Sequence, residues 1–77
     1  MEKILVDFHN SDKKGRVRLN TNGTRTDLEK NNIILIEGIE LLLHDGDELV
    51  TKGIINYSKD ENIWVAEIDW NDLKNKE

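Results

Sequence analysis

The chain has 77 residues, no cysteine, no proline and a formal net charge of −5 at pH 7. The absence of cysteine excludes disulfides and thiolate metal sites, and a chain of this length supports only one small hydrophobic core. No apolar run reaches the roughly 20 residues of a membrane helix. We therefore expect one domain over residues 1–71, a frayed polar tail over residues 72–77, a cytoplasmic location and no membrane partner.

Two alternating runs near the start of the chain predict a β-hairpin. Lys3–Phe8 and Arg16–Asn20 each place apolar side chains at every second position, and a polar turn over residues 9–15 separates them. Alternate side chains of a strand share one face, so each run offers an apolar face to a core. We expect the two runs to pair with each other.

A short helix is predicted next. Thr26-Asp27-Leu28-Glu29 fits a capping box, in which the Thr26 hydroxyl and the Glu29 carboxylate each accept a hydrogen bond from the other residue's amide. We expect one helical turn near residues 26–31. Because so short a helix is unstable alone, Leu28 should dock on the sheet.

The remaining apolar runs predict an antiparallel meander, broken by glycine-, asparagine- and aspartate-containing turns. These runs are Ile33–Ile36, Ile39–His44, Leu49–Tyr57 and Ile63–Trp70. Gly53 predicts a bulge or a close approach of two strands. Together the runs favour a mainly β fold, a small SH3-like antiparallel barrel of five to six strands, because closure hides the sheet edges. The alternative is an open α+β sheet covered by the helix.

The last of these runs holds both tryptophans. One of its faces carries Trp64, Ala66, Ile68 and Trp70, and the other turns from apolar to acidic at Glu67 and Asp69. Alternation along a strand therefore assigns the first three of these side chains to the core. The acidic end of the run is expected to enter solvent.

The sequence favours a protein that is not an enzyme. It has two histidines, His9 and His44, and it lacks a nucleophile elbow and any phosphate-binding glycine loop. The acids of residues 45–48 fit a hairpin turn better than a calcium loop. We expect no catalytic, cofactor-binding or metal-binding residue, and no cofactor.

Two groups of residues are candidates for binding. Tryptophan is enriched at binding hot spots, and the predicted interaction residues are Trp70, Asp69, Glu67 and Tyr57. A basic cluster could contact phosphates or another anion, and its members are Lys13, Lys14, Arg16, Arg18 and Arg25. Alternatively, the arginines pair across strands with Glu37, Glu40 or Glu67.

Three segments resemble a group of short bacterial proteins with the pattern GTxxDL…EGxxLxL…WVAxIDW. The segments begin at Gly23, Glu37 and Trp64, and the likeness covers most of residues 15–70. The resemblance implies a stand-alone bacterial domain with a small SH3-like β-barrel. It carries over no activity and no functional residue.

Charge and composition rank three functions. Residues 1–30 contain seven basic and five acidic side chains, whereas residues 31–77 contain four basic and eleven acidic ones. We first expect a non-enzymatic protein-interaction module of a bacterial cytoplasm, since an acidic chain with few aromatic residues fits a protein partner better than nucleic acid. Nucleic-acid binding through the basic cluster is the alternative, and an acidic inhibitor or decoy of a basic partner is the third. A homodimer is also expected, because a small core without cross-links gains from association.

Overall fold

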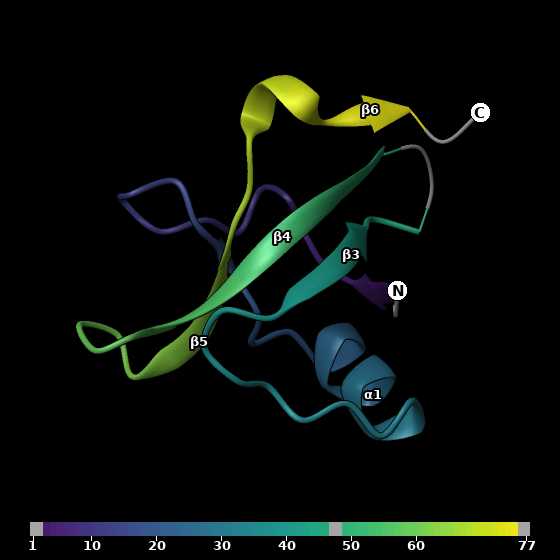
Figure 1. The fold of residues 1–77 in the computed structure, drawn as a ribbon, viewed down its shortest axis with the longest axis vertical. Helices are drawn as coiled ribbons and strands as arrows, with labels where there is room; N and C mark the ends of the chain where they lie inside the picture. Colours follow the sequence, from purple (N-terminus) through teal and green to yellow (C-terminus); the bar gives the residue numbers. More distant parts are fainter. Residues whose placement is uncertain (1–2, 47–48, 76–77) are drawn as a thin grey trace.

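A computed structural model describes residues 3–46 and 49–75 of the chain. Its elements in chain order are β1 (Lys3–Leu5), β2 (Val17–Arg18), α1 (Asn22–Lys30), β3 (Glu40–His44), β4 (Leu49–Ser58), β5 (Ile63–Glu67), the 3₁₀ helix η1 (Trp70–Asp72) and β6 (Lys74–Asn75). The strands form a curled half-barrel, with α1 at one end and the η1–β6 segment at the other (Figure 1). This confirms the predicted small, mainly β domain with one helix.

The sheet is mixed rather than wholly antiparallel. Its strand order is β1-β3-β4-β5-β2, and β6 pairs with β4 off this path. β1 runs parallel to β3, whereas the other strand pairs are antiparallel. The ten-residue β4 is the central strand, because β3 lies along one side of it and both β5 and β6 lie along the other.

The predicted pairing of Lys3–Phe8 with Arg16–Asn20 is wrong. β1 pairs with β3, and the chain then turns, with the Asn10 amide donating to the Asp7 carbonyl at 2.9 Å. The hairpin partners of β2 are instead residues 10–12, linked by the Ser11–Val17 bridge. Alternation showed that these runs were strands. It could not show which strands pair, because that choice depends on the rest of the sheet.

Helix α1 begins earlier than the capping box at Thr26 predicted. The N-cap is Thr21, whose hydroxyl accepts a hydrogen bond from the Thr24 amide at 3.2 Å, while Thr26 lies exposed within the helix. A threonine cap five residues upstream therefore extends the helix to nine residues. Leu28 packs against the core, as expected of the apolar anchor.

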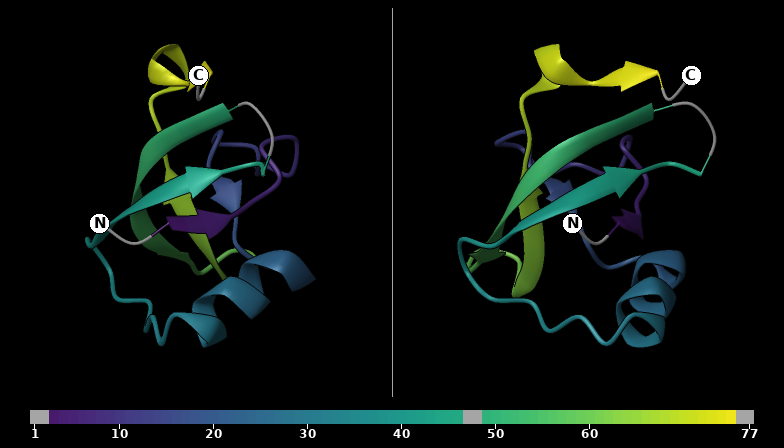
Figure 2. Two further views of the ribbon diagram at one scale, coloured as in Figure 1. Left: turned by 90° about the vertical axis from the view of Figure 1, so that its right-hand side faces the viewer. Right: turned by 45° about the vertical axis from the view of Figure 1, so that its right-hand side comes forward.

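The outer edge of β1 is covered by two side chains of α1. The Leu5 amide donates to Asp27 Oδ2 at 2.8 Å, and the hydroxyl of the fully buried Thr24 donates to the Leu5 carbonyl at 2.6 Å. These bonds replace the ladder that another strand would supply, since an exposed edge invites unwanted pairing. The helix thus closes one border of the sheet (Figure 2).

The core lies inside the curl of the sheet. It consists of Ile4, Val6, Phe8, Val17, Leu19, Leu41, Leu43, Ile55 and Ala66. A Cβ atom at Gly53 would lie 2.8 Å from Leu43 Cδ1 and 3.2 Å from Ala66 Cβ. The predicted close approach at Gly53 is therefore confirmed, because no side chain fits between these neighbours.

The final run of the chain departs from the predicted strand and tail at its end. Ala66 is buried, and Trp64 and Ile68 pack against the core as predicted. The strand itself ends at Glu67, and the tail is not frayed throughout, because Lys74 and Asn75 pair with the start of β4. β4 offers this free side because its ladder with β5 begins only at Ile54. Residues 76–77 lie outside the described part of the chain.

Candidate interaction site

Trp70 is exposed and yet held in place. The Asp69 carboxylate caps η1 by accepting from the Asn71 amide at 2.9 Å, which turns the chain away from the sheet. The Trp70 side chain is 43 % exposed, and its Nε1–H donates to the Gly15 carbonyl at 2.9 Å. Its ring meets the Phe8 ring edge-on, with centroids 6.4 Å apart. A fixed, half-exposed indole is the kind of side chain that anchors binding partners.

An open groove runs beside Trp70, and we call it the Trp70 groove. Its volume is about 440 Å³, and its lining residues are Leu5, Val6, Asp7, Phe8, His9, Thr21, Gly23, Asp45, Leu49, Trp70 and Leu73. The apolar members come from β1 and the chain after it, from the start of β4 and from the C-terminal segment. Residues distant in sequence thus form one largely apolar wall.

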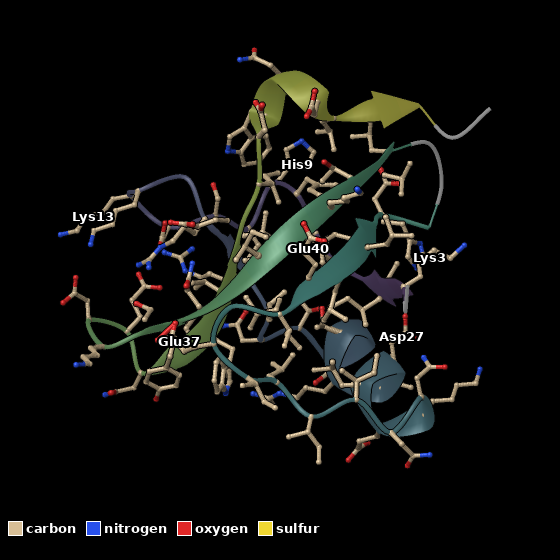
Figure 3. All side chains as sticks on the ribbon, viewed as in Figure 1. Lys3, His9, Lys13, Asp27, Glu37 and Glu40 are labelled. Atoms are coloured by element: carbon tan, nitrogen blue, oxygen red, sulfur yellow. The ribbon has the colours of Figure 1, made fainter. Side chains whose placement is uncertain are left out.

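The charged groups that line the Trp70 groove are acidic. Asp7 and Asp45 contribute carboxylates, and Asp45 Oδ1 also accepts from the Leu49 amide at 3.0 Å. The His9 ring is fully exposed, with Nδ1 3.6 Å from Asp7 Oδ1, at the end of the molecule where η1 lies (Figure 3). These carboxylates favour a ligand that carries a positive charge near its apolar part.

A second, polar hollow lies on the other side of Trp70. Its volume is about 410 Å³, and Lys14, Gly15, Arg16, Glu67, Ile68 and Trp70 line it. The structure therefore brings part of the basic cluster next to the predicted acidic exit of β5. The sequence treated these two groups as separate candidates.

Arg16 is paired within its own loop. Its Nε donates to Asp12 Oδ2 at 2.9 Å, while the amides of Lys14 and Arg16 donate to Asp12 Oδ1 at 3.0 and 2.8 Å. Burial of Asp12 opposes ionisation, but the hydrogen bonds from Arg16 and Lys14 outweigh it and hold the pKa of Asp12 below its ordinary value. This buried carboxylate fixes the turn that presents Gly15 to Trp70.

Arg18 is paired across the sheet with a residue that the sequence did not indicate. Its Nε and Nη2 donate to the two oxygens of Glu61 at 2.7 and 2.9 Å, and its Nη1 donates to Asn10 Oδ1 at 3.2 Å. The bond to Arg18 lowers the pKa of Glu61, and the same bond raises the pKa of Arg18. Arg16 and Arg18 therefore pair with carboxylates of the chain, as the alternative to phosphate contact predicted, but the partners are Asp12 and Glu61 and not Glu37, Glu40 or Glu67.

The predicted site residues do not all converge. Trp70, Asp69 and Glu67 lie at the exit of β5, whereas Tyr57 pairs with Trp64 at the start of β5, their rings 5.1 Å apart. Arg25 is exposed on α1, and in Figure 3 that helix, marked by Asp27, lies across the molecule from Lys13. The basic residues thus do not form one continuous surface.

Sequence reasoning missed most of the Trp70 groove. Leu5, Phe8 and Leu49 seemed to be ordinary strand residues, and each also lines the groove. Leu73 alone carried a local signal, because it is a large apolar residue in an otherwise polar tail. Leu73 packs against the core as well as lining the groove.

Three findings bear on other kinds of site. Over residues 3–46 and 49–75, no group of three metal-binding side chains could hold a metal ion, and no helix is long and apolar enough to cross a membrane. No buried side-chain nitrogen or oxygen among these residues lacks a hydrogen-bond partner.

No family model, curated protein or solved structure matches the chain.

Proposed function

We propose that this protein is a non-enzymatic protein-interaction module that binds a peptide segment of a partner in the Trp70 groove. One observation carries the proposal. An indole that is 43 % exposed is locked by a hydrogen bond to Gly15 at the edge of an apolar hollow of about 440 Å³. Preorganised aromatic side chains bind at low entropic cost, because they lose little freedom on association.

The chemistry of the groove defines the segment that it would accept. Leu5, Phe8 and Leu73 offer apolar contacts, and Asp7 and Asp45 line the same Trp70 groove with their carboxylates. A large apolar side chain next to a lysine or arginine satisfies both features. The volume lies within the usual range of ligand pockets, about 300–1,000 Å³. A peptide segment that fills a groove of this volume buries only a small interface, as is typical of transient complexes.

The experiment is a selection from a random peptide library displayed on phage, using the immobilised protein. The affinity of each selected peptide is then measured for the wild type and for two variants. Trp70→Ala removes the wall of the groove, while Ile34→Ser changes an exposed apolar side chain on another part of the surface. We expect peptides that combine an aromatic or aliphatic residue with a lysine or arginine.

The proposal requires that Trp70→Ala weaken these peptides at least about tenfold, as truncation of a hot-spot tryptophan does, while Ile34→Ser leaves them unchanged. A selection that enriches no sequence would contradict it. So would peptides that bind Trp70→Ala as tightly as they bind the wild type.

Nucleic-acid binding is the second candidate. The polar hollow places Lys14 and Arg16 beside the exposed indole, and single-stranded nucleic acids bind to such combinations of cations and aromatic rings. This proposal has less support, because Arg16 already pairs with Asp12 and because Arg25 lies on another element. The acidic decoy has support only from the overall charge of −5.

A further inference from the structure

The segment between α1 and β3 holds the two large hydrophobic residues with the highest exposed fractions in the described part of the chain. The Ile34 side chain is 79 % exposed and the Ile36 side chain is 58 % exposed, while Ile33 and Leu35 pack against the core. Burial thus alternates along the segment, as it does along a strand, but both faces are apolar. Strands with two apolar faces are normally covered on both sides.

Three backbone amides of this segment also lack a partner within the described residues, although the Ile36 carbonyl accepts from the Ile39 amide at 3.3 Å. The Ile33 amide donates to Leu28 and the Gly38 amide donates to Ile55, but no hydrogen bond engages the amides of Ile34, Leu35 or Ile36. Residues with positive φ, Asn32 at 56° and Gly38 at 90°, bound the segment. Figure 2 shows it running along the border of the molecule, away from the strands of the sheet. Sequence reasoning grouped Ile33–Ile36 with the strands, and in the single chain it forms none.

We propose that this segment pairs with the same segment of a second copy of the chain. The two segments run antiparallel about a two-fold axis at Leu35, so that Ile34 of each copy faces Ile36 of the other. Antiparallel pairing supplies partners for the free amides on the facing side of the segment, because alternate residues direct their amides to opposite sides. It also places apolar side chains opposite apolar side chains in cross-strand pairs. The contact is isologous, as in most homodimers.

The charges at the two ends of the segment favour this partner and this direction. Lys30 ends α1 before the segment, and Glu37 follows it. Antiparallel self-pairing brings the basic end of one copy toward the acidic end of the other, whereas parallel pairing would set like charges together. Glu29 lies beside Lys30 and reduces this complementarity, so the isoleucine pairs contribute most of the attraction.

The first test is sedimentation equilibrium of the wild type over micromolar to millimolar concentrations. The contact is small, so we expect a weak dimer, with a dissociation constant on the order of 100 µM. The double variant Ile34→Ser/Ile36→Ser should weaken it about tenfold or more, while Trp70→Ala should leave it unchanged. Circular dichroism verifies that each variant is folded.

The second test reads the register directly. The chain contains no cysteine, so Ile34→Cys and Ile36→Cys each introduce a single thiol. Facing residues of an antiparallel pair lie about 4.5–5.5 Å apart between Cα atoms. Equivalent residues are diagonal neighbours about 7–8 Å apart, which is beyond the reach of a disulfide, about 7 Å. An equimolar mixture of the two variants should therefore form the mixed disulfide in clear excess over either symmetric one.

Three results would overturn the inference. They are a wild type that stays monomeric at millimolar concentration, a dimer that Ile34→Ser/Ile36→Ser does not weaken, and a statistical mixture of disulfides. Loss of peptide binding in Trp70→Ala affects none of these measurements. The dimer and the Trp70 groove can therefore fail separately.

Discussion

The loop before β2 and the exit of β5 differ in how completely their side chains are paired or covered by other residues of the protein. In the loop, Arg16 is bound to Asp12, and the neighbouring Arg18 is bound to Glu61. At the exit, the hydrogen bond of Trp70 is made, but much of its ring faces solvent beside an open groove. A cluster of charges in a sequence can therefore be an internal network, while an apolar side chain stays available for a partner when no neighbour covers it.

The two regions also depend on each other. The Asp12–Arg16 interaction shapes the loop that carries Gly15, and the Gly15 carbonyl accepts the hydrogen bond that orients Trp70. The charged loop is thus a support, and the groove is the surface that it supports. Substitutions in the two regions should therefore differ in how much stability they cost.

Removing the central carboxylate should have the largest effect. Asp12→Ala leaves three donors without their acceptor at a side chain that is only 4 % exposed. We expect the free energy of unfolding to fall by about 2–3 kcal/mol, measured by urea denaturation. The matched control Asp60→Ala changes an exposed acid and should cost less than about 0.5 kcal/mol. Equal losses in the two variants would show that the loop is an ordinary charged surface.

Truncating Trp70 should cost less stability than removing Asp12. Trp70→Phe keeps an aromatic ring near Phe8 but loses the hydrogen bond to Gly15, so we expect a loss of about 1 kcal/mol. Trp70→Ala should cost about 1–2 kcal/mol, since only part of the side chain is buried, and the cooperative thermal transition should remain. If that transition disappears in Trp70→Ala, the residue belongs to the core and the comparison fails.

Acid should destabilise the protein through the paired carboxylates of the loop and its neighbour. The pKa values of Asp12 and Glu61 are lowered in the folded state, so their stabilisation is complete above their unfolded values, about 4. It is lost as the pH falls through the lower folded values. The urea concentration at the midpoint of unfolding, measured from pH 6 to pH 2, should therefore decrease once the pH is below 4. This concentration should decrease less steeply in the Asp12→Asn variant. Parallel curves for the two proteins would contradict this assignment.

Oligonucleotide binding should show the smallest effect. Lys13 and Lys14 are exposed on the loop, while Arg16 and Arg18 are already paired. We expect single-stranded DNA to bind no more tightly than about 100 µM at 0.15 M salt, measured by fluorescence anisotropy. A tighter, salt-dependent complex that Lys13→Glu/Lys14→Glu abolishes would favour the nucleic-acid proposal over the Trp70 groove.

Local patterns were sufficient to find most elements but not to pair them. The apolar runs at β3, β4 and β5 predicted strands, and Gly53 predicted the close approach found beside Leu43. The parallel pairing of β1 with β3 was not predictable, because alternation reports which face is apolar and not which neighbour lies alongside. The start of α1 was missed because two threonine caps compete, and Thr21 comes first in the chain.

The candidate site was predictable only in part. The sequence placed Trp70 at the solvent end of the last run, and the structure finds this side chain exposed. It could not show that Phe8, Leu49 and Leu73 meet there, because these residues come from three separate parts of the chain. It also could not show that Glu61 neutralises Arg18, since 43 residues separate the two.

By itself, the sequence determined a small, mainly β domain without cysteine chemistry, because length, composition and alternation act locally along the chain. Only the tertiary structure decided which charges are paired and which apolar side chains remain uncovered. The physical reason is that pairing and burial depend on distances between elements that are remote in sequence. Trp70 and Ile34 are both large apolar residues in the sequence, and the fold alone gives one of them a groove and the other an unpaired edge.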